Sequence, residues 1–165
     1  MKKIISIIAI ALSTFSCSQA QQTEFKAEAL SNTMKTVENT DITFQEILKK
    51  YEGKTIVIDV WASWCPDCIK GMPKVKTLQE NYPDATYLFL SVDKNHDSWL
   101  KGIEKYDVQG EHYLIADGMK GVFGKSINLD WIPRYMIVDK TGKIALFKVI
   151  EADDDKLIET LERLK

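Results

Sequence analysis

Two cysteines separated by two residues, Cys65 and Cys68, are the side chains of this chain best suited to chemistry. The apolar run at residues 55–60 predicts a buried strand before them, and residues 69–82 predict a helix after them, with Pro66 at the first helical position. Cys65 would lie at the exposed N-terminus of that helix, where free backbone N–H groups and the helix dipole stabilise a thiolate. The spacing predicts a redox-active dithiol in which Cys65 attacks a disulfide and the more buried Cys68 resolves the mixed disulfide.

A zinc site is the main alternative for such a pair, because Cys-x-x-Cys is often half of a four-ligand site. The chain has no second cysteine pair, and its two histidines, His96 and His112, lie far from both cysteines in the sequence. We therefore predict no metal at the pair and no cofactor.

Two carboxylates near the cysteines bear on the redox chemistry. Asp59 interrupts the apolar strand, and a buried carboxylate without a partner is costly, so we expect its pKa to be raised. An edge-exposed or salt-bridged Asp59 is the alternative. Asp67, which follows Pro66 between the cysteines, disfavours the Cys65 thiolate and makes the couple more reducing. The Pro66-Asp67 dipeptide between the cysteines therefore favours a reductant over a strong oxidant.

Apolar periodicity predicts the elements that must position these residues. Thr43 and Glu46 form the pattern of a capping box at a helix start. The predicted helices are 43–51, 69–82, 97–106, 119–126 and 153–164. The predicted strands are 55–61, 86–92, 111–116, 134–138 and 143–149, the last two as an antiparallel hairpin, with a further short strand within 33–42. Strands that alternate with helices indicate an α/β fold with a mixed sheet and helices on both faces.

The N-terminus carries an export signal. Lys2 and Lys3 precede the short apolar run 4–15, and small residues end at Ala20, so residues 1–20 predict a signal peptide cleaved after Ala20. The alternative is a lipoprotein anchored at Cys17. Residues 21–32 predict a tether, and residues 33–165 one domain. Export places the protein in an oxidising compartment such as the periplasm, and the net charge of −2 indicates no nucleic-acid partner.

Residues 59–68, with Pro73 five residues later, resemble the thioredoxin active site, and their Trp-Ala-Ser-Trp-Cys-x-x-Cys form is similar to that of the secreted TlpA/ResA-like thioredoxins. The resemblance extends from Ile42 to the C-terminus. It implies a thioredoxin fold with a TlpA/ResA-type central insertion, formed by the strand and helix predicted at 111–126. One residue departs from the pattern: Gly71 stands where these proteins usually have glutamate.

The resemblance also implies roles for individual residues. Ile132 and Pro133 match the family's cis-proline site, which faces the cysteine pair and exposes backbone to an extended substrate segment. Trp64 is implied to lie on the surface beside Cys65, and Asp59 to take and return the proton of Cys68. Trp131 either lines the substrate groove or packs inside.

These features together predict an exported thiol–disulfide oxidoreductase that reduces partner protein disulfides and is recharged by a membrane thiol donor. One alternative is a disulfide-forming oxidase on the same scaffold. Another is a copper-binding chaperone, although thioredoxin-like copper proteins space their cysteines one residue wider and place a histidine near the metal.

Overall fold

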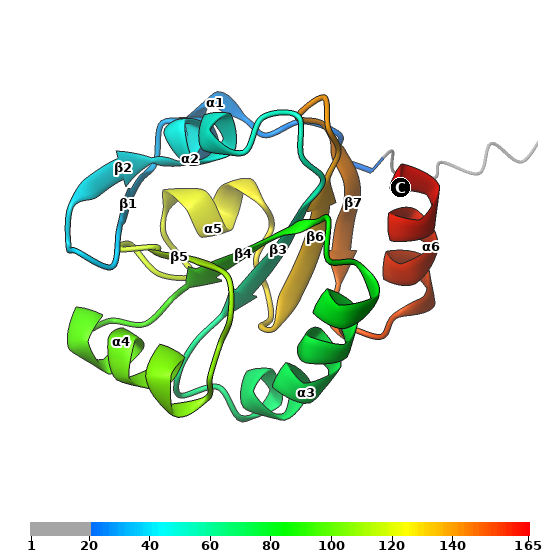
Figure 1. Cartoon of the computed structure of the whole chain (residues 1–165). Helices are drawn as coiled ribbons and strands as arrows, with labels where there is room; N and C mark the ends of the chain where they lie inside the picture. Colours follow the sequence, from blue (N-terminus) through cyan, green and yellow to red (C-terminus); the bar gives the residue numbers. More distant parts are fainter. Residues whose placement is uncertain (1–20) are drawn as a thin grey trace, which may run out of the picture.

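The computed structural model describes residues 21–165 (Figure 1). The predicted signal peptide and the alternative anchor Cys17 lie outside these residues. Within residues 21–165, no helix is both long enough and apolar enough to cross a bilayer.

A seven-stranded mixed sheet forms the centre of the domain, in the order β2-β1-β5-β4-β3-β6-β7. β3 pairs in parallel with β4 and antiparallel with β6, so both of its edges are covered. The strands are β1 (Thr33–Lys35), β2 (Asp41–Thr43), β3 (Ile56–Trp61), β4 (Thr86–Ser91), β5 (Glu111–Leu114), β6 (Arg134–Val138) and β7 (Ile144–Val149). The predicted mixed sheet and its closing hairpin β6–β7 are confirmed.

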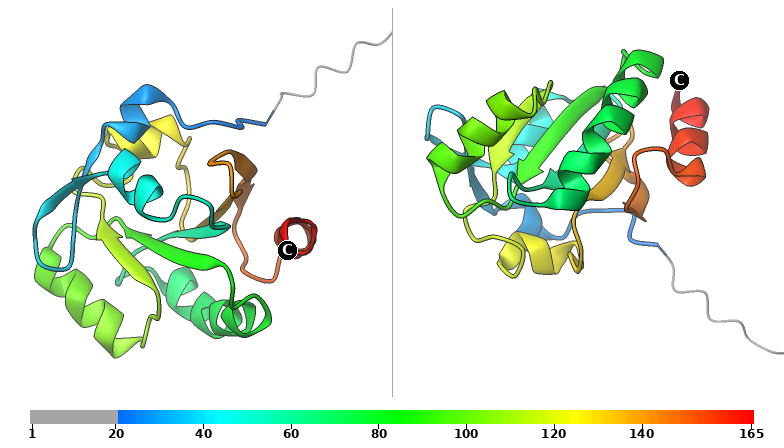
Figure 2. Two further views of the ribbon diagram at one scale, coloured as in Figure 1. Left: turned by 45° about the horizontal axis from the view of Figure 1, so that its top comes forward. Right: turned by 90° about the horizontal axis from the view of Figure 1, so that it is seen from below.

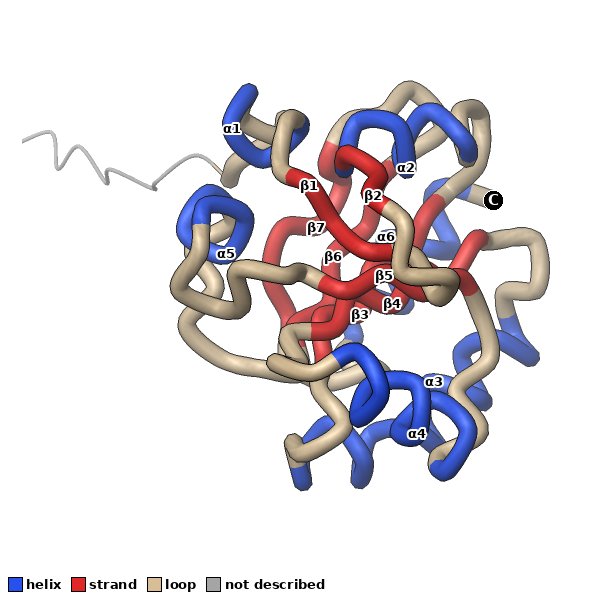
Figure 3. The backbone as a smooth tube through the Cα atoms, turned by 90° about the vertical axis from the view of Figure 1, so that its left-hand side faces the viewer, coloured by secondary structure: helices blue, strands red, loops and turns tan. Residues whose placement is uncertain are grey.

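Helices cover both faces of this sheet (Figures 2 and 3). They are α1 (Ala27–Leu30), α2 (Phe44–Lys50), α3 (Pro66–Asn81), α4 (His96–Lys105), α5 (Val122–Ser126) and α6 (Asp155–Leu164). On one face α3 is joined to α6 by the Tyr82–Glu162 hydrogen bond, whereas α2 and α5 meet on the other through Phe44 and Phe123. The capping box predicted at Thr43 and Glu46 is present at the start of α2.

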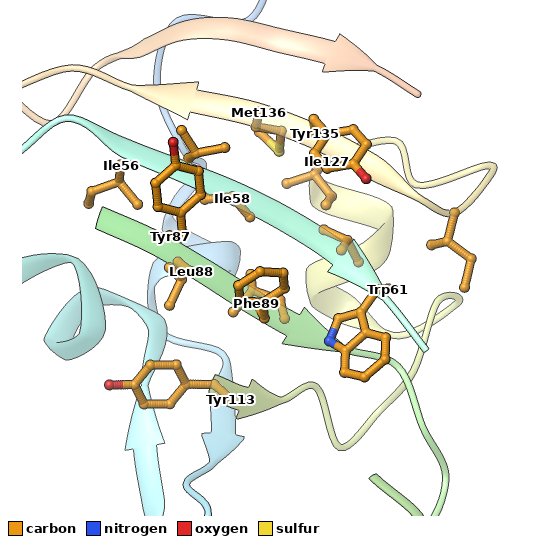
Figure 4. Close-up of a cluster of buried hydrophobic side chains, with 14 of the residues drawn as sticks. Ile56, Ile58, Trp61, Tyr87, Leu88, Phe89, Tyr113, Ile127, Tyr135 and Met136 are labelled. Carbon is orange, nitrogen blue, oxygen red and sulfur yellow. The ribbon is translucent and has the colours of Figure 1, made fainter. Parts of the chain in front are cut away.

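β3 is buried along its whole length, as its apolar run predicts. Trp61 and the neighbouring Phe89 of β4 lie in the cluster drawn in Figure 4. A strand flanked on both edges and both faces has almost no solvent contact. The strand therefore brings Asp59 to the interior, and β3 ends at Trp61, four residues before Cys65.

The N-terminal segment differs from the tether predicted over residues 21–32. Residues 27–30 form α1, and Phe25 and Ala29 are buried. Phe25 packs edge-on against Phe44 of α2, with ring centroids 4.8 Å apart. Burial of an aromatic ring against an apolar surface is favourable, so this segment belongs to the domain. The strand predicted within 33–42 is a hairpin of two strands, β1 and β2.

Candidate active site

Cys65 and Cys68 lie where β3 passes into α3. Cys65 is the N-cap residue of α3, and the backbone N–H of Cys68 donates a hydrogen bond to its Sγ, with N and S 3.2 Å apart. Their Cα atoms are 5.3 Å apart and the two residues form a disulfide. The helix begins at Pro66, where a missing N–H leaves no hydrogen bond unmade. The predicted placement of the cysteine pair at a helix N-terminus is confirmed.

The exposure predicted for Cys65 is wrong in this disulfide form. Cys65 is 4% exposed and Cys68 is 1% exposed. The carbonyl oxygen of Ile132 lies 3.7 Å from the Cys65 sulfur, so the Ile132–Pro133 segment covers the sulfur that a partner must reach. The Ile132–Pro133 peptide bond is cis.

Arg134, the first residue of β6, anchors the loop that leads to Pro133, and sequence reasoning missed it. Its side chain is fully buried, and its guanidinium donates to the carbonyl oxygens of Ile127 and Asn128, each at 3.2 Å, and to the Asp130 carboxylate. Desolvation lowers the pKa of Arg134, and the charge of Asp130 opposes that shift. The signal that could have identified Arg134 was a charged residue in an otherwise apolar strand, which is also what marked Asp59.

Asp59 is buried, as predicted, with 3% of its surface exposed. Neither carboxylate oxygen makes a hydrogen bond, which excludes the salt-bridged alternative in this structure, and burial within a strand paired on both edges excludes the edge-exposed one. Desolvation raises the pKa of Asp59 to about 8, and the nearby Tyr135 hydroxyl opposes part of that rise without meeting hydrogen-bond geometry. A carboxyl group in this state is protonated near neutrality and ready to exchange a proton.

The buried side chain of Asp93, two residues after β4, holds the turn before Cys65. Asp93 accepts hydrogen bonds from the backbone N–H of Ser63 at 2.9 Å, from the Ser63 hydroxyl at 2.7 Å and from the Ser91 hydroxyl at 2.7 Å. A Cβ on Gly102 of α4 would lie 2.4 Å from the Ser63 Cβ, so only glycine lets α4 pack there. The sequence offered no local signal for this contact, because Ser63 and Asp93 are thirty residues apart.

The Asp93→Asn substitution is expected to lower stability by about 2 kcal/mol, because an amide replaces one of the two accepting oxygens and removes the charge that strengthens these hydrogen bonds. Urea unfolding should show a lower midpoint with an unchanged slope. The matched control is Asp84→Asn, at an exposed aspartate, which should leave the midpoint in place. Equal midpoints for Asp93→Asn and the parent chain would show that Asp93 does not hold the turn.

A pocket of about 350 Å³ opens beside the cysteines, lined by Asp67, Lys70, Gly71, Lys74, Trp131, Pro133, Ile150 and Glu151. Trp131 is 55% exposed and Trp64, adjacent to Cys65, is 57% exposed. The structure therefore places Trp131 on the pocket wall and Trp64 on the surface, whereas Trp61 is fully buried. Trp131 and Pro133 thus line the same pocket as Asp67, which lies between the two cysteines in the sequence.

The two histidines contact backbone carbonyl groups rather than the cysteines. The Nε2 of His96 lies 3.1 Å from the carbonyl oxygen of Thr36, and that of His112 lies 3.0 Å from the carbonyl oxygen of Val108. His112 also stacks on Phe89.

Comparison with known proteins agrees with this geometry. The family profile described as Redoxin matches residues 21–161. The thiol-disulfide oxidoreductase ResA of Bacillus thuringiensis is 26% identical over 128 residues, which cover 76% of this chain and 72% of that protein. A protein of Bacteroides vulgatus described as a thiol-disulfide oxidoreductase has a solution structure with a TM-score of 0.68 and 30% identity, covering 82% of this chain and 87% of the other.

A secreted disulfide oxidoreductase of Mycobacterium tuberculosis, described as homologous to Escherichia coli DsbE, has the same fold. Its TM-score is 0.63 at 20% identity, over 84% of this chain and all of the other. The profile match, the relatives and the cysteine pair at the start of α3 lead to one assignment: this chain belongs to the Redoxin family and is a thiol–disulfide oxidoreductase with the thioredoxin fold.

Proposed function

We propose that this protein reduces disulfides of exported partner proteins through the Cys65–Cys68 dithiol. The observation that carries the proposal is the Cys65 sulfur at the N-cap of α3, where it accepts the backbone N–H of Cys68. A helix N-terminus favours the thiolate that attacks. The side chain of Asp67 in the first turn of α3 opposes that effect and supports a reducing couple.

The reaction is two successive thiol–disulfide exchanges. The Cys65 thiolate attacks one sulfur of the partner disulfide, a mixed disulfide forms, and one partner thiolate leaves. In the molecules whose Asp59 is ionised, Cys68 gives its proton to this carboxylate, and the Cys68 thiolate attacks the Cys65 sulfur. The second partner thiolate leaves, the proton returns from Asp59 to the solvent or to that thiolate, and two electrons have passed to the partner. The protein is left with the Cys65–Cys68 disulfide described above.

Trp64, Ile132 and Pro133 are proposed to hold the partner. An extended segment of the partner would lie along the backbone at Ile132 and Pro133, in the manner of strand addition. The exposed Trp64 and Trp131 flank this path and offer apolar area to the residues next to the partner cysteine. Because Cys65 is only 4% exposed, the partner must fit closely against this loop.

The Trp131→Ala substitution is expected to raise the KM for a protein disulfide about tenfold with little change in kcat, since truncation of an aromatic contact typically costs 1 to 2 kcal/mol of binding. A small disulfide that does not reach the pocket should react at the parent rate. Val122→Ala, at an exposed apolar residue of α5, is the control. An unchanged KM would remove Trp131 from the binding surface.

We also propose that the protein is exported and that its Cys65–Cys68 disulfide is reduced again by a membrane donor. A secreted relative of the same fold and the signal-peptide pattern at residues 1–20 support export with cleavage after Ala20, and lipidation at Cys17 is the alternative route to the same compartment. A reductase in an oxidising compartment needs an electron source, and a membrane thiol donor would supply it.

The reduction potential of the Cys65–Cys68 couple tests the direction of electron flow. The protein without residues 1–20 is equilibrated with glutathione or dithiothreitol buffers. A value near that of thioredoxin, about −270 mV, supports the reductase. A value near about −120 mV would make the protein an oxidase that introduces disulfides, which is the competing proposal.

A further inference from the structure

Tyr135 is a polar side chain next to the buried Asp59. The two residues are directly opposite each other in the antiparallel pair of β3 and β6. Tyr135 is 1% exposed and lies beside β3 in Figure 4. The other strand neighbour of Asp59 is Phe89 of β4, which has no polar atom in its side chain. A tyrosine hydroxyl is therefore the group available to respond when the carboxyl ionises.

The Tyr135 hydroxyl also reaches toward α3. A Cβ built on Gly71 would lie 3.4 Å from this oxygen, an ordinary van der Waals distance, so the hydroxyl lies close to α3 at Gly71. Gly71 lines the pocket beside the cysteines. Tyr135 is thus the cross-strand partner of Asp59, and its hydroxyl lies close to Gly71, a residue that lines the pocket.

The charged groups around this tyrosine are engaged elsewhere or lie at the surface. Lys74 of α3 binds Glu151 at 2.7 Å and Asp153 at 2.9 Å. Asp67 and Lys70 are exposed on the pocket rim. Among the described residues, no salt bridge includes Asp59.

We propose that Tyr135 is a positioning residue for Asp59: its hydroxyl donates a hydrogen bond to the carboxylate when Asp59 ionises, and so sets the pH at which Cys68 resolves the mixed disulfide. The proposal rests on the proton role of Asp59 in the proposed function. Burial favours the neutral carboxyl, whereas a donor favours the carboxylate. Burial also raises the pKa of the Tyr135 hydroxyl above its ordinary value, with the negative charge of Asp59 adding to the rise, so the hydroxyl keeps its proton.

One proton moves in the resolving step. The Cys68 thiol loses its proton to the Asp59 carboxylate as its sulfur attacks Cys65, and Tyr135 donates a hydrogen bond without losing its own proton. Without the hydroxyl, ionised Asp59 has no donor, so a smaller fraction of molecules holds the base at a given pH. The resolving step should then require a higher pH.

The test follows the reduced protein after it is mixed with a chromogenic aryl disulfide, in a stopped-flow instrument across a range of pH. The first aryl thiolate reports the attack of Cys65, and the second reports the resolving step of Cys68. The variants are Tyr135→Phe, Asp59→Asn and the double variant. Tyr87→Phe is the matched control, because it removes a buried hydroxyl that is bonded to the carbonyl oxygens of Leu78 and Tyr82.

We expect Tyr135→Phe to shift the pH profile of the second release upward by about one unit, which makes this step roughly tenfold slower near pH 7. The first release should not change, and Tyr87→Phe should match the parent protein. In the Asp59→Asn background the Tyr135→Phe substitution should have no further effect.

Three results would overturn the inference, and they differ in what else fails. If Tyr135→Phe matches the parent profile while Asp59→Asn loses it, only the role of Tyr135 fails. If the Tyr135→Phe shift persists without Asp59, the hydroxyl acts on Cys68 itself. If Asp59→Asn keeps the parent profile, the proton role of Asp59 in the proposed function fails as well.

Discussion

Replacing Cys65 with serine is expected to abolish disulfide reduction, whereas replacing Cys68 with serine should stop the reaction one step later. The hydroxyl of serine does not ionise at neutral pH, so Cys65→Ser has no nucleophile and activity falls to that of the uncatalysed exchange. In Cys68→Ser, the Cys65 thiolate still attacks, and the mixed disulfide accumulates because nothing resolves it. Activity assays with a protein disulfide, together with intact-mass spectrometry, measure both effects.

The two variants should differ in whether a mixed disulfide with the partner accumulates. A protein that acted only as a metal carrier would lose binding equally with either cysteine and would trap no partner. A Cys68→Ser protein that forms no mixed disulfide would show that Cys65, with its sulfur beneath the Ile132 carbonyl, is not the attacking residue. The trapped partner would also identify a physiological substrate.

Asp59→Asn is expected to stabilise the oxidised protein at alkaline pH by roughly 3 to 5 kcal/mol. In the native protein the pKa of Asp59 is raised from 3.8 to about 8. Between these values the unfolded chain has lost this proton and the native state has kept it. The free energy of unfolding is therefore highest, as far as Asp59 is concerned, below about pH 4, and it falls as pH rises toward 8. Asparagine is neutral in both states and removes this dependence.

Urea unfolding of the oxidised protein at about pH 4 and about pH 9 measures the effect. The two proteins should have nearly equal stability at the acidic pH and differ most at the alkaline pH. Asp84→Asn, at an exposed carboxylate, should behave like the parent protein at both. A constant difference between Asp59→Asn and the parent across this range would show that the Asp59 carboxyl is not held neutral by burial.

The same substitution should slow the resolving step, so stability and activity move in opposite directions. A buried carboxyl with no hydrogen bond is a stability cost that a core does not need. Higher stability together with a slower resolving step in Asp59→Asn would support the proposal that Asp59 serves the dithiol rather than the fold.

Much of this protein was determined by local sequence. The apolar run before Cys65 led to a buried strand, Pro66 marked the helix start, and the capping box at Thr43 began α2 as predicted. These signals depend on neighbouring residues alone: periodicity selects the element and its buried face, and caps select its ends. Asp59 was recognisable because a charged residue within an apolar strand stands out without any tertiary information.

Tertiary structure decided which side chains surround the cysteines. Asp93 reaches Ser63 across thirty residues, and Arg134 closes the loop before Pro133. Tyr135 faces Asp59 only because of the register of β3 and β6. Packing also brought Phe25 onto Phe44 and covered the sulfur of Cys65. Strand register and side-chain packing depend on contacts between distant segments, and the pattern within one segment does not encode them.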